Sequence, residues 1–131
     1  MVIWTIRGGT LRVQVPSKAP DGNVIIRAIR EAIEDPAFKS GLELLIDARH
    51  YDNAASVEIA APELRNRAGA ISRLGFKHCA LVVAPVPVRR GLANMFRAYA
   101  EEHGLPTAVF EDIESAEAWL AEGPETGHTG R

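Results

Sequence analysis

The residues best suited to chemistry gather in one stretch, LIDARHYDNAASVE, which runs from Leu45 to Glu58. It begins as an apolar strand and continues, after Ile46, as a series of polar and ionisable side chains. These side chains are Asp47, Arg49, His50, Tyr51, Asp52, Asn53 and Ser56. A polar loop that follows a buried strand can be an active site, a phosphorylation switch or ordinary surface.

An acid–base function would centre on His50, which Asp47 or Asp52 could orient as a general base. The nucleophile would then be Ser56 or the single cysteine, Cys79, whose surroundings in the sequence are those of a core strand. The sequence contains neither a nucleophile elbow nor an HExxH motif. We therefore favour a polar loop that forms the wall of a binding site, and we assign no catalytic residue and no metal ligand.

Arg89 and Arg90 form a second candidate group, at the start of a predicted helix that follows the segment APVPV. The free N–H groups and the dipole of a helix start favour anions, and guanidinium groups bind phosphate or carboxylate. Arginines at a helix start can equally be solvated or paired with surface acids. No phosphate-binding glycine motif is present to separate these two interpretations.

The elements that must position these residues begin with a hairpin, because apolar and polar residues alternate on both sides of Gly8-Gly9. The runs LELLIDA, CALVVA and TAVF are short and apolar, as expected of strands buried on both faces. Apolar residues at helical spacing, together with proline and glycine boundaries, predict four helices. These helices lie near Ile25–Ile33, at 62–74, at 89–103 and after the predicted cap Asp112.

The resulting order is ββαβαβαβα, which predicts an α/β fold with a mixed, mainly parallel five-stranded sheet and four helices. The opening hairpin requires one antiparallel strand, which we expect at an edge of the sheet. We expect a single domain over 1–122, followed by a polar tail over 123–131. Ligands of such sheets bind beyond the carboxyl ends of the parallel strands, which is where the loops 47–61 and 84–91 should meet.

The composition excludes several functional classes. A net charge of −2 leaves no basic footprint for nucleic acid. One cysteine is too few for a disulfide or a structural zinc site, which fits a reducing compartment. We expect no signal peptide and no membrane span, because the first residues lack the required pattern and no apolar run is long enough. A cytoplasmic protein without a cofactor is the expectation.

The chain resembles the STAS domain of anti-sigma-factor antagonists, and more closely the SpoIIAA-like group of small bacterial proteins. The resemblance is strongest in HCALVVAPVPVRRGLANMFRAYAEEHGLPTAVFEDIESAEAWL, where a strand, a Gly-Leu-Ala helix start, a short strand and an Ala-X-X-Trp-Leu helix follow the order typical of the family. The strand that ends at Asp47 fits as well. The SpoIIAA-like fold is also related to CRAL-TRIO lipid-binding domains, so the resemblance implies a binding or signalling domain.

The resemblance also implies a candidate phosphorylation site. In STAS domains a partner kinase modifies a serine in an Asp-Ser loop, and the added charge blocks docking. Ser56 is the corresponding residue here, nine positions after Asp47. Its neighbours depart from the family pattern, because Ala55 replaces the aspartate and Val57-Glu58 replace the small residues.

Two functional hypotheses follow. The leading one is a non-enzymatic domain that binds a protein partner or a small nonpolar or amphipathic ligand, with homodimer formation also open. Its contact residues would be Asp47, His50, Tyr51, Ser56, Arg89, Arg90, Leu92, Met95 and Phe96. The alternative is an enzyme acting on an anionic small molecule, with His50 as the base and Arg89 or Arg90 as the anion clamp.

Overall fold

A computed structural model describes residues 3–16, 23–50 and 61–122 of the chain. The chain enters the sheet through an antiparallel hairpin of β1 (Ile3–Arg7) and β2 (Thr10–Gln14). Gly8 and Gly9 form its turn with φ values of 59° and 82°, a backbone conformation that strongly favours glycine over other residues. The hairpin predicted from the Gly-Gly pair is therefore confirmed.

Three parallel strands extend the sheet from β2. The later elements are α1 (Asn23–Ile33), β3 (Glu43–Asp47), α2 (Ala61–Ser72), β4 (Cys79–Val82), α3 (Pro87–Glu102), β5 (Thr107–Phe110) and α4 (Ile113–Glu122). The strands lie in the order β1-β2-β3-β4-β5, and only the β1–β2 pair is antiparallel. The predicted α/β fold, with its mixed and mainly parallel five-stranded sheet, is confirmed.

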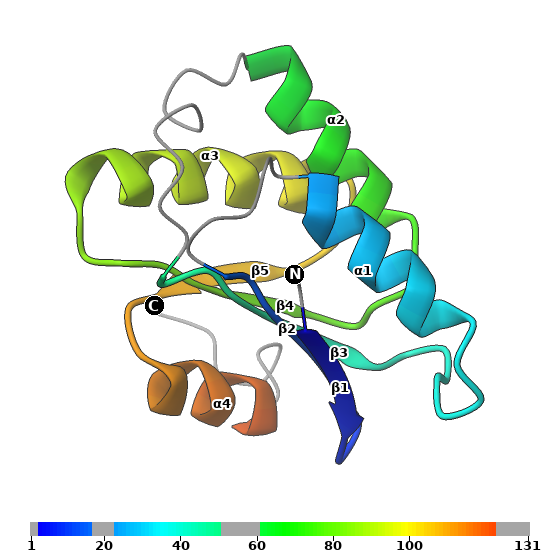
Figure 1. The fold of residues 1–131 in the computed structure, drawn as a ribbon. Helices are drawn as coiled ribbons and strands as arrows, with labels where there is room; N and C mark the ends of the chain where they lie inside the picture. Colours follow the sequence, from blue (N-terminus) through cyan, green and yellow to red (C-terminus); the bar gives the residue numbers. More distant parts are fainter. Residues whose placement is uncertain (1–2, 17–22, 51–60, 123–131) are drawn as a thin grey trace.

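The helices divide unequally between the two faces of the sheet (Figure 1). Helices α1, α2 and α3 cover one face, which we call the three-helix face, and α4 alone packs on the other, over β3, β4 and β5. Side chains of a strand alternate between the faces. Leu44 and Ile46 accordingly join the larger core cluster, whereas Leu45 packs with Ala116 and Leu120 of α4.

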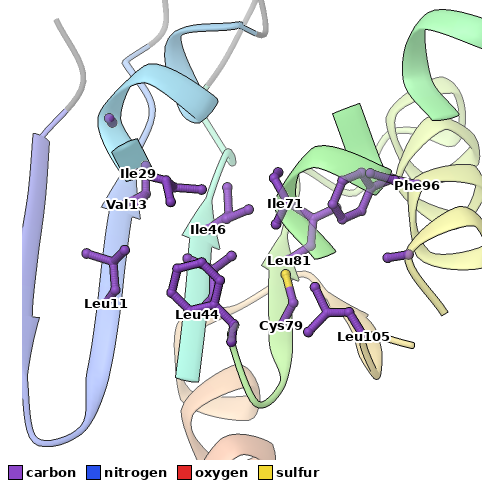
Figure 2. Packing of buried hydrophobic residues seen from close by; sticks show 14 of the residues in the cluster. Leu11, Val13, Ile29, Leu44, Ile46, Ile71, Cys79, Leu81, Phe96 and Leu105 are labelled. Atoms are coloured by element: carbon purple, nitrogen blue, oxygen red, sulfur yellow. The ribbon is translucent and has the colours of Figure 1, made fainter. Parts of the chain in front are cut away.

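The larger core fills the space beneath the three-helix face. In Figure 2, Ile46 and Leu81 extend from β3 and β4, while Ile71 and Phe96 meet them from α2 and α3. Cys79 is fully buried in this core, and burial raises the pKa of its thiol to about 12. The single cysteine is thus a protonated core residue at neutral pH.

Local signals set the ends of the helices. Gly75 and Gly104 have φ values of 89° and 91°, as predicted for the glycines that follow α2 and α3. Asp112 caps α4 by accepting a hydrogen bond of 2.7 Å from the backbone N–H of Ser115, so the predicted cap is confirmed. Helix α3 begins at Pro87, two residues earlier than expected, because proline suits the first turn of a helix.

Candidate functional site

Asp47 and its neighbour Ile46 point to opposite faces of the sheet. Asp47 lies at the carboxyl end of β3 on the α4 side, because it follows Leu45 by two residues. Arg12 of β2 lies on the same side, with its Nη2 4.0 Å from Asp47 Oδ2 and its Nη1 3.5 Å from Glu117 Oε2 of α4. Asp47 therefore faces α4 and an ionic cluster.

The carboxylate of Asp47 is fully buried and well paired. Arg49 donates to it from Nε at 2.9 Å, from Nη2 at 3.0 Å and from the backbone N–H at 3.2 Å. Burial raises the pKa of Asp47, but the hydrogen bonds and charge of Arg49, with the charge of Arg12, outweigh burial and lower it overall. Asp47 is thus an ionised residue that holds the loop start to the end of the strand.

A cavity of about 140 Å³ lies on the three-helix face, between the sheet and the helices. Its floor comes from the carboxyl ends of β3 and β4 and the residues that follow them, and its walls come from α1, α2 and α3. The lining residues are Ile25, Ile26, Ile46, Ala48, Leu64, Arg67, Ile71, Leu81, Val83, Arg89, Leu92, Ala93 and Phe96. We call this space the inner cavity; its described lining is apolar except for two arginines.

Arg67 is the unexpected member of this lining. It lies on α2 between Leu64 and Ile71, three residues after one and four before the other, so all three share the inner face of the helix. Its side chain is 15% exposed, and its Nη2 donates to Glu63 Oε2 at 3.2 Å. Its Nε is buried and has no hydrogen-bond partner among the described residues.

The candidate contact residues of the 84–91 region and α3 separate into two groups. Arg89, Leu92 and Phe96 line the inner cavity. Arg90 instead forms an ion pair with Glu111 after β5, and Met95 is 38% exposed outside the lining. Two adjacent arginines at one helix start therefore have different surroundings.

The residues after β3 are placed only in part. His50 is exposed and is not among the residues that line the inner cavity. Asp47, one of its two candidate orienting groups, is engaged by Arg49 instead. Tyr51 and Ser56 lie outside the described residues.

A larger concavity of about 690 Å³ lies on the opposite face, beside α4. It covers the part of the sheet formed by the hairpin and is lined by both Arg12 and Glu117, with threonines, glycines and a few apolar residues. Charges of both signs and wide polar walls give it no single preference for a ligand class. The inner cavity is smaller but chemically more uniform, and it lies where ligands of open α/β sheets bind.

Sequence reasoning did not assign a role to Arg67. The signal was available, because a cation interrupts an otherwise apolar helical stripe of Leu64, Ala68 and Ile71. A charged residue on such a face is rarely buried unless it has a partner. Spacing alone, however, does not reveal that the neighbouring helices leave a cavity beside it.

Comparisons with known proteins give no independent lead: no family model, no curated protein and no solved structure matches the chain. Within the described residues, no group of histidine, cysteine or acidic side chains is arranged to hold a metal ion. No helix in that part of the chain is sufficiently long and apolar to cross a membrane.

Proposed function

We propose that the protein binds a small nonpolar or amphipathic molecule in the inner cavity. The observation that carries the proposal is the composition of the cavity, where eleven of the thirteen described lining residues are apolar and the other two are arginines. Ligand sites typically combine an apolar lining with a few polar groups that fix orientation. The cavity also lies at the carboxyl ends of β3 and β4, the usual ligand position in this fold class.

The volume limits the size of the ligand. An engineered apolar cavity of about 150 Å³ stays dry and binds benzene or xenon. The inner cavity, at about 140 Å³, is nearly the same size, but it is partly open to the surface. A single ring or a short branched chain therefore fits without rearrangement, and a longer ligand would have to extend through the mouth of the cavity.

The lining of the cavity supports a protein that binds its ligand without converting it. The described part of the lining contains no serine, cysteine, histidine or acidic residue, so none of these residues can act as nucleophile or general base near neutral pH. The enzymatic alternative requires His50 to reach the same ligand as Arg89. A His50→Ala variant that lost turnover of an anionic substrate would favour the enzyme.

A titration with toluene tests the proposal. The methyl NMR signals of Ile46 and Ile71 should shift with a saturable dependence on toluene, because both side chains line the cavity. Ala48→Leu should weaken toluene binding at least about tenfold, since the added carbons occupy the same volume. The matched control is Ala121→Leu on the exposed end of α4, which should leave the affinity unchanged.

Two results would contradict the proposal. One is a set of methyl shifts that stay linear in toluene concentration or appear away from the cavity. The other is an equal loss of affinity in Ala48→Leu and Ala121→Leu. Thermal unfolding of both variants separates a filled cavity from a damaged fold, because a filled cavity leaves the folded state intact.

A protein-binding role is the second candidate. Val86 just before α3, and Val88 and Met95 within it, are 45%, 46% and 38% exposed, and exposed apolar side chains can mark a contact site. A second copy of the chain is the simplest partner. Native mass spectrometry should then show a dimer that Val88→Asp converts to monomer, and a wild-type monomer at micromolar concentration would reject this role.

We further propose that the protein is a cytoplasmic relative of SpoIIAA-like domains. The support is the combination of the ββαβαβαβα order with the sequence resemblance over residues 78–120. In this proposal the ligand-binding cavity, rather than a phosphorylated Ser56, is the main site of regulation.

A further inference from the structure

We infer that the molecule bound in the inner cavity carries one carboxylate, and that Arg67 binds this carboxylate. The inference rests on the proposed function and specifies the chemical class of its ligand. It starts from a polar group that the protein leaves unsatisfied. Arg67 Nε is buried and has no hydrogen-bond partner among the described residues.

A buried donor without a partner lowers stability, and the loss is greater when the donor belongs to a charged group. Among the described residues, Arg67 forms one ion pair. Its Nη2 donates to Glu63, whose side chain is 54% exposed, so solvent screens the attraction between the two charges. An acceptor that entered with a ligand would satisfy the remaining Nε–H.

Arg49, in the same protein, is an arginine whose Nε and Nη2 donors both have acceptors. Its Nε and Nη2 donate to the two oxygens of Asp47 at 2.9 and 3.0 Å. This paired geometry is the one in which arginine binds a carboxylate most strongly. In the part of the chain that the structure describes, these two atoms of Arg67 make one hydrogen bond, from Nη2 to Glu63 Oε2, so a carboxylate from a ligand suits the Nε donor.

The charge of the cavity favours an acid over a neutral acceptor. Among the described residues, the charged members of the lining are the cations Arg67 and Arg89, and none is acidic. The N-terminal turns of α3 contribute Arg89, Leu92 and Ala93, and the positive end of a helix dipole adds to the attraction for an anion. An ester or alcohol could accept the hydrogen bond but would bring no negative charge to the two arginines.

A small movement of Arg67 completes the site. The Nε atom is buried although Arg67 lines the cavity, so the side chain must turn to present this atom to a ligand. Rotamer changes of this kind are common when ligands and partners bind. The bound molecule would place its apolar body against Ile46, Ile71 and Phe96 and its carboxylate at Arg67, near the α2 wall.

The test compares two ligands of similar shape, benzoate and toluene, at pH 7, where carboxylic acids are ionised. Benzoate should bind the wild-type protein at least about tenfold more tightly than toluene, as expected of one hydrogen bond to a charged group. Arg67→Met should remove this preference while keeping the affinity for toluene. Arg67→Lys should restore part of it, because lysine keeps the charge but lacks the fork.

The matched control is Arg65→Met, two residues earlier on α2. It removes the same charge from an exposed arginine that stacks on Tyr99 at 4.9 Å from the ring centroid, outside the cavity. Its benzoate preference should equal that of the wild type. The side-chain Nε–H NMR signal of Arg67 should also shift with benzoate and stay in place with toluene.

The outcomes separate the inference from the proposed function. Failure of toluene to bind at all would reject the inner cavity as a site, and with it both proposals. Toluene binding without a benzoate preference, or a preference that survives Arg67→Met, would reject only the role of Arg67. Tighter binding of phenyl phosphate than of benzoate would overturn the assignment to a carboxylate, because Glu63 beside Arg67 should repel a doubly charged group.

Discussion

Two adjacent residues of β3, Ile46 and Asp47, belong to two regions with opposite chemistry, one apolar and one ionic. Asp47 faces α4, where Arg49 and Arg12 neutralise its charge. Ile46 faces the other side and borders a cavity that the surrounding helices do not fill. The ionisable residue that attracts attention in the sequence is satisfied by its own neighbours. The apolar face beside it keeps the space and the unpaired donor that a ligand can use.

The largest effect should come from a polar substitution on the apolar side. Ile46→Asn should lower the free energy of unfolding by about 4 kcal/mol, because it removes a buried aliphatic side chain and leaves an amide without partners. Ile46 is 2% exposed, so water cannot compensate from the surface. Urea denaturation measures the loss. A cost below about 1 kcal/mol would mean that the three-helix face tolerates polarity and is not a closed apolar layer.

The ionic side should respond less strongly. Asp47→Asn should lower the free energy of unfolding by about 2–3 kcal/mol, less than a fully buried ion pair loses, because Arg49 is partly exposed. Toluene binding in the inner cavity should not change, since Asp47 lies across the sheet. If Asp47→Asn kept its stability but no longer bound toluene, then Asp47 would contribute to ligand binding and not to the stability of the fold.

Acid should weaken the ionic side selectively. The folded state lowers the pKa of Asp47, so its ionised form stabilises the fold above the ordinary pKa near 4, and this contribution disappears as the pH falls through the lowered value. Stability measured from pH 7 to pH 2 should therefore fall less steeply in Asp47→Asn than in the wild type. Asp112→Asn is the comparison variant: the hydrogen bonds of Ser115 also lower the pKa of Asp112, but at an exposed position, so this substitution should flatten the pH dependence less than Asp47→Asn.

The smallest effect should come from the surface pair of Arg90 and Glu111. Their side chains are 44% and 40% exposed, and exposed ion pairs contribute about 0–1 kcal/mol. Arg90→Gln should change the free energy of unfolding by less than about 0.5 kcal/mol and should leave benzoate binding intact. A loss of benzoate affinity comparable to that of Arg67→Met would place the anion site at the start of α3 instead.

The sequence predicted most of the fold because its local signals agree with one another. Gly8-Gly9 fixed the hairpin, Gly75 and Gly104 marked two helix ends, and Asp112 marked the start of the last helix. Short apolar runs between helical stripes then left few topologies other than a mainly parallel sheet. The main differences lie at element ends, where proline at position 87 starts a helix earlier than the arginines suggest.

The candidate site was less predictable, and the reason is geometric. Sequence can place Asp47, Arg89 and Arg90 near the ends of strands, but it does not say toward which face each side chain points. It also does not show that Arg90 has a partner in Glu111 or that Asp47 has one in Arg49. The inner cavity exists only because three helices meet the sheet with space between them, which depends on packing at long range.

Xenon pressurisation of protein crystals tests the central claim most directly. Xenon enters apolar cavities of about this size that contain no ordered water. The account predicts a xenon atom in the inner cavity, in contact with Ile46, Ile71 and Phe96. A cavity that holds hydrogen-bonded water instead, or that side chains have filled, would contradict it.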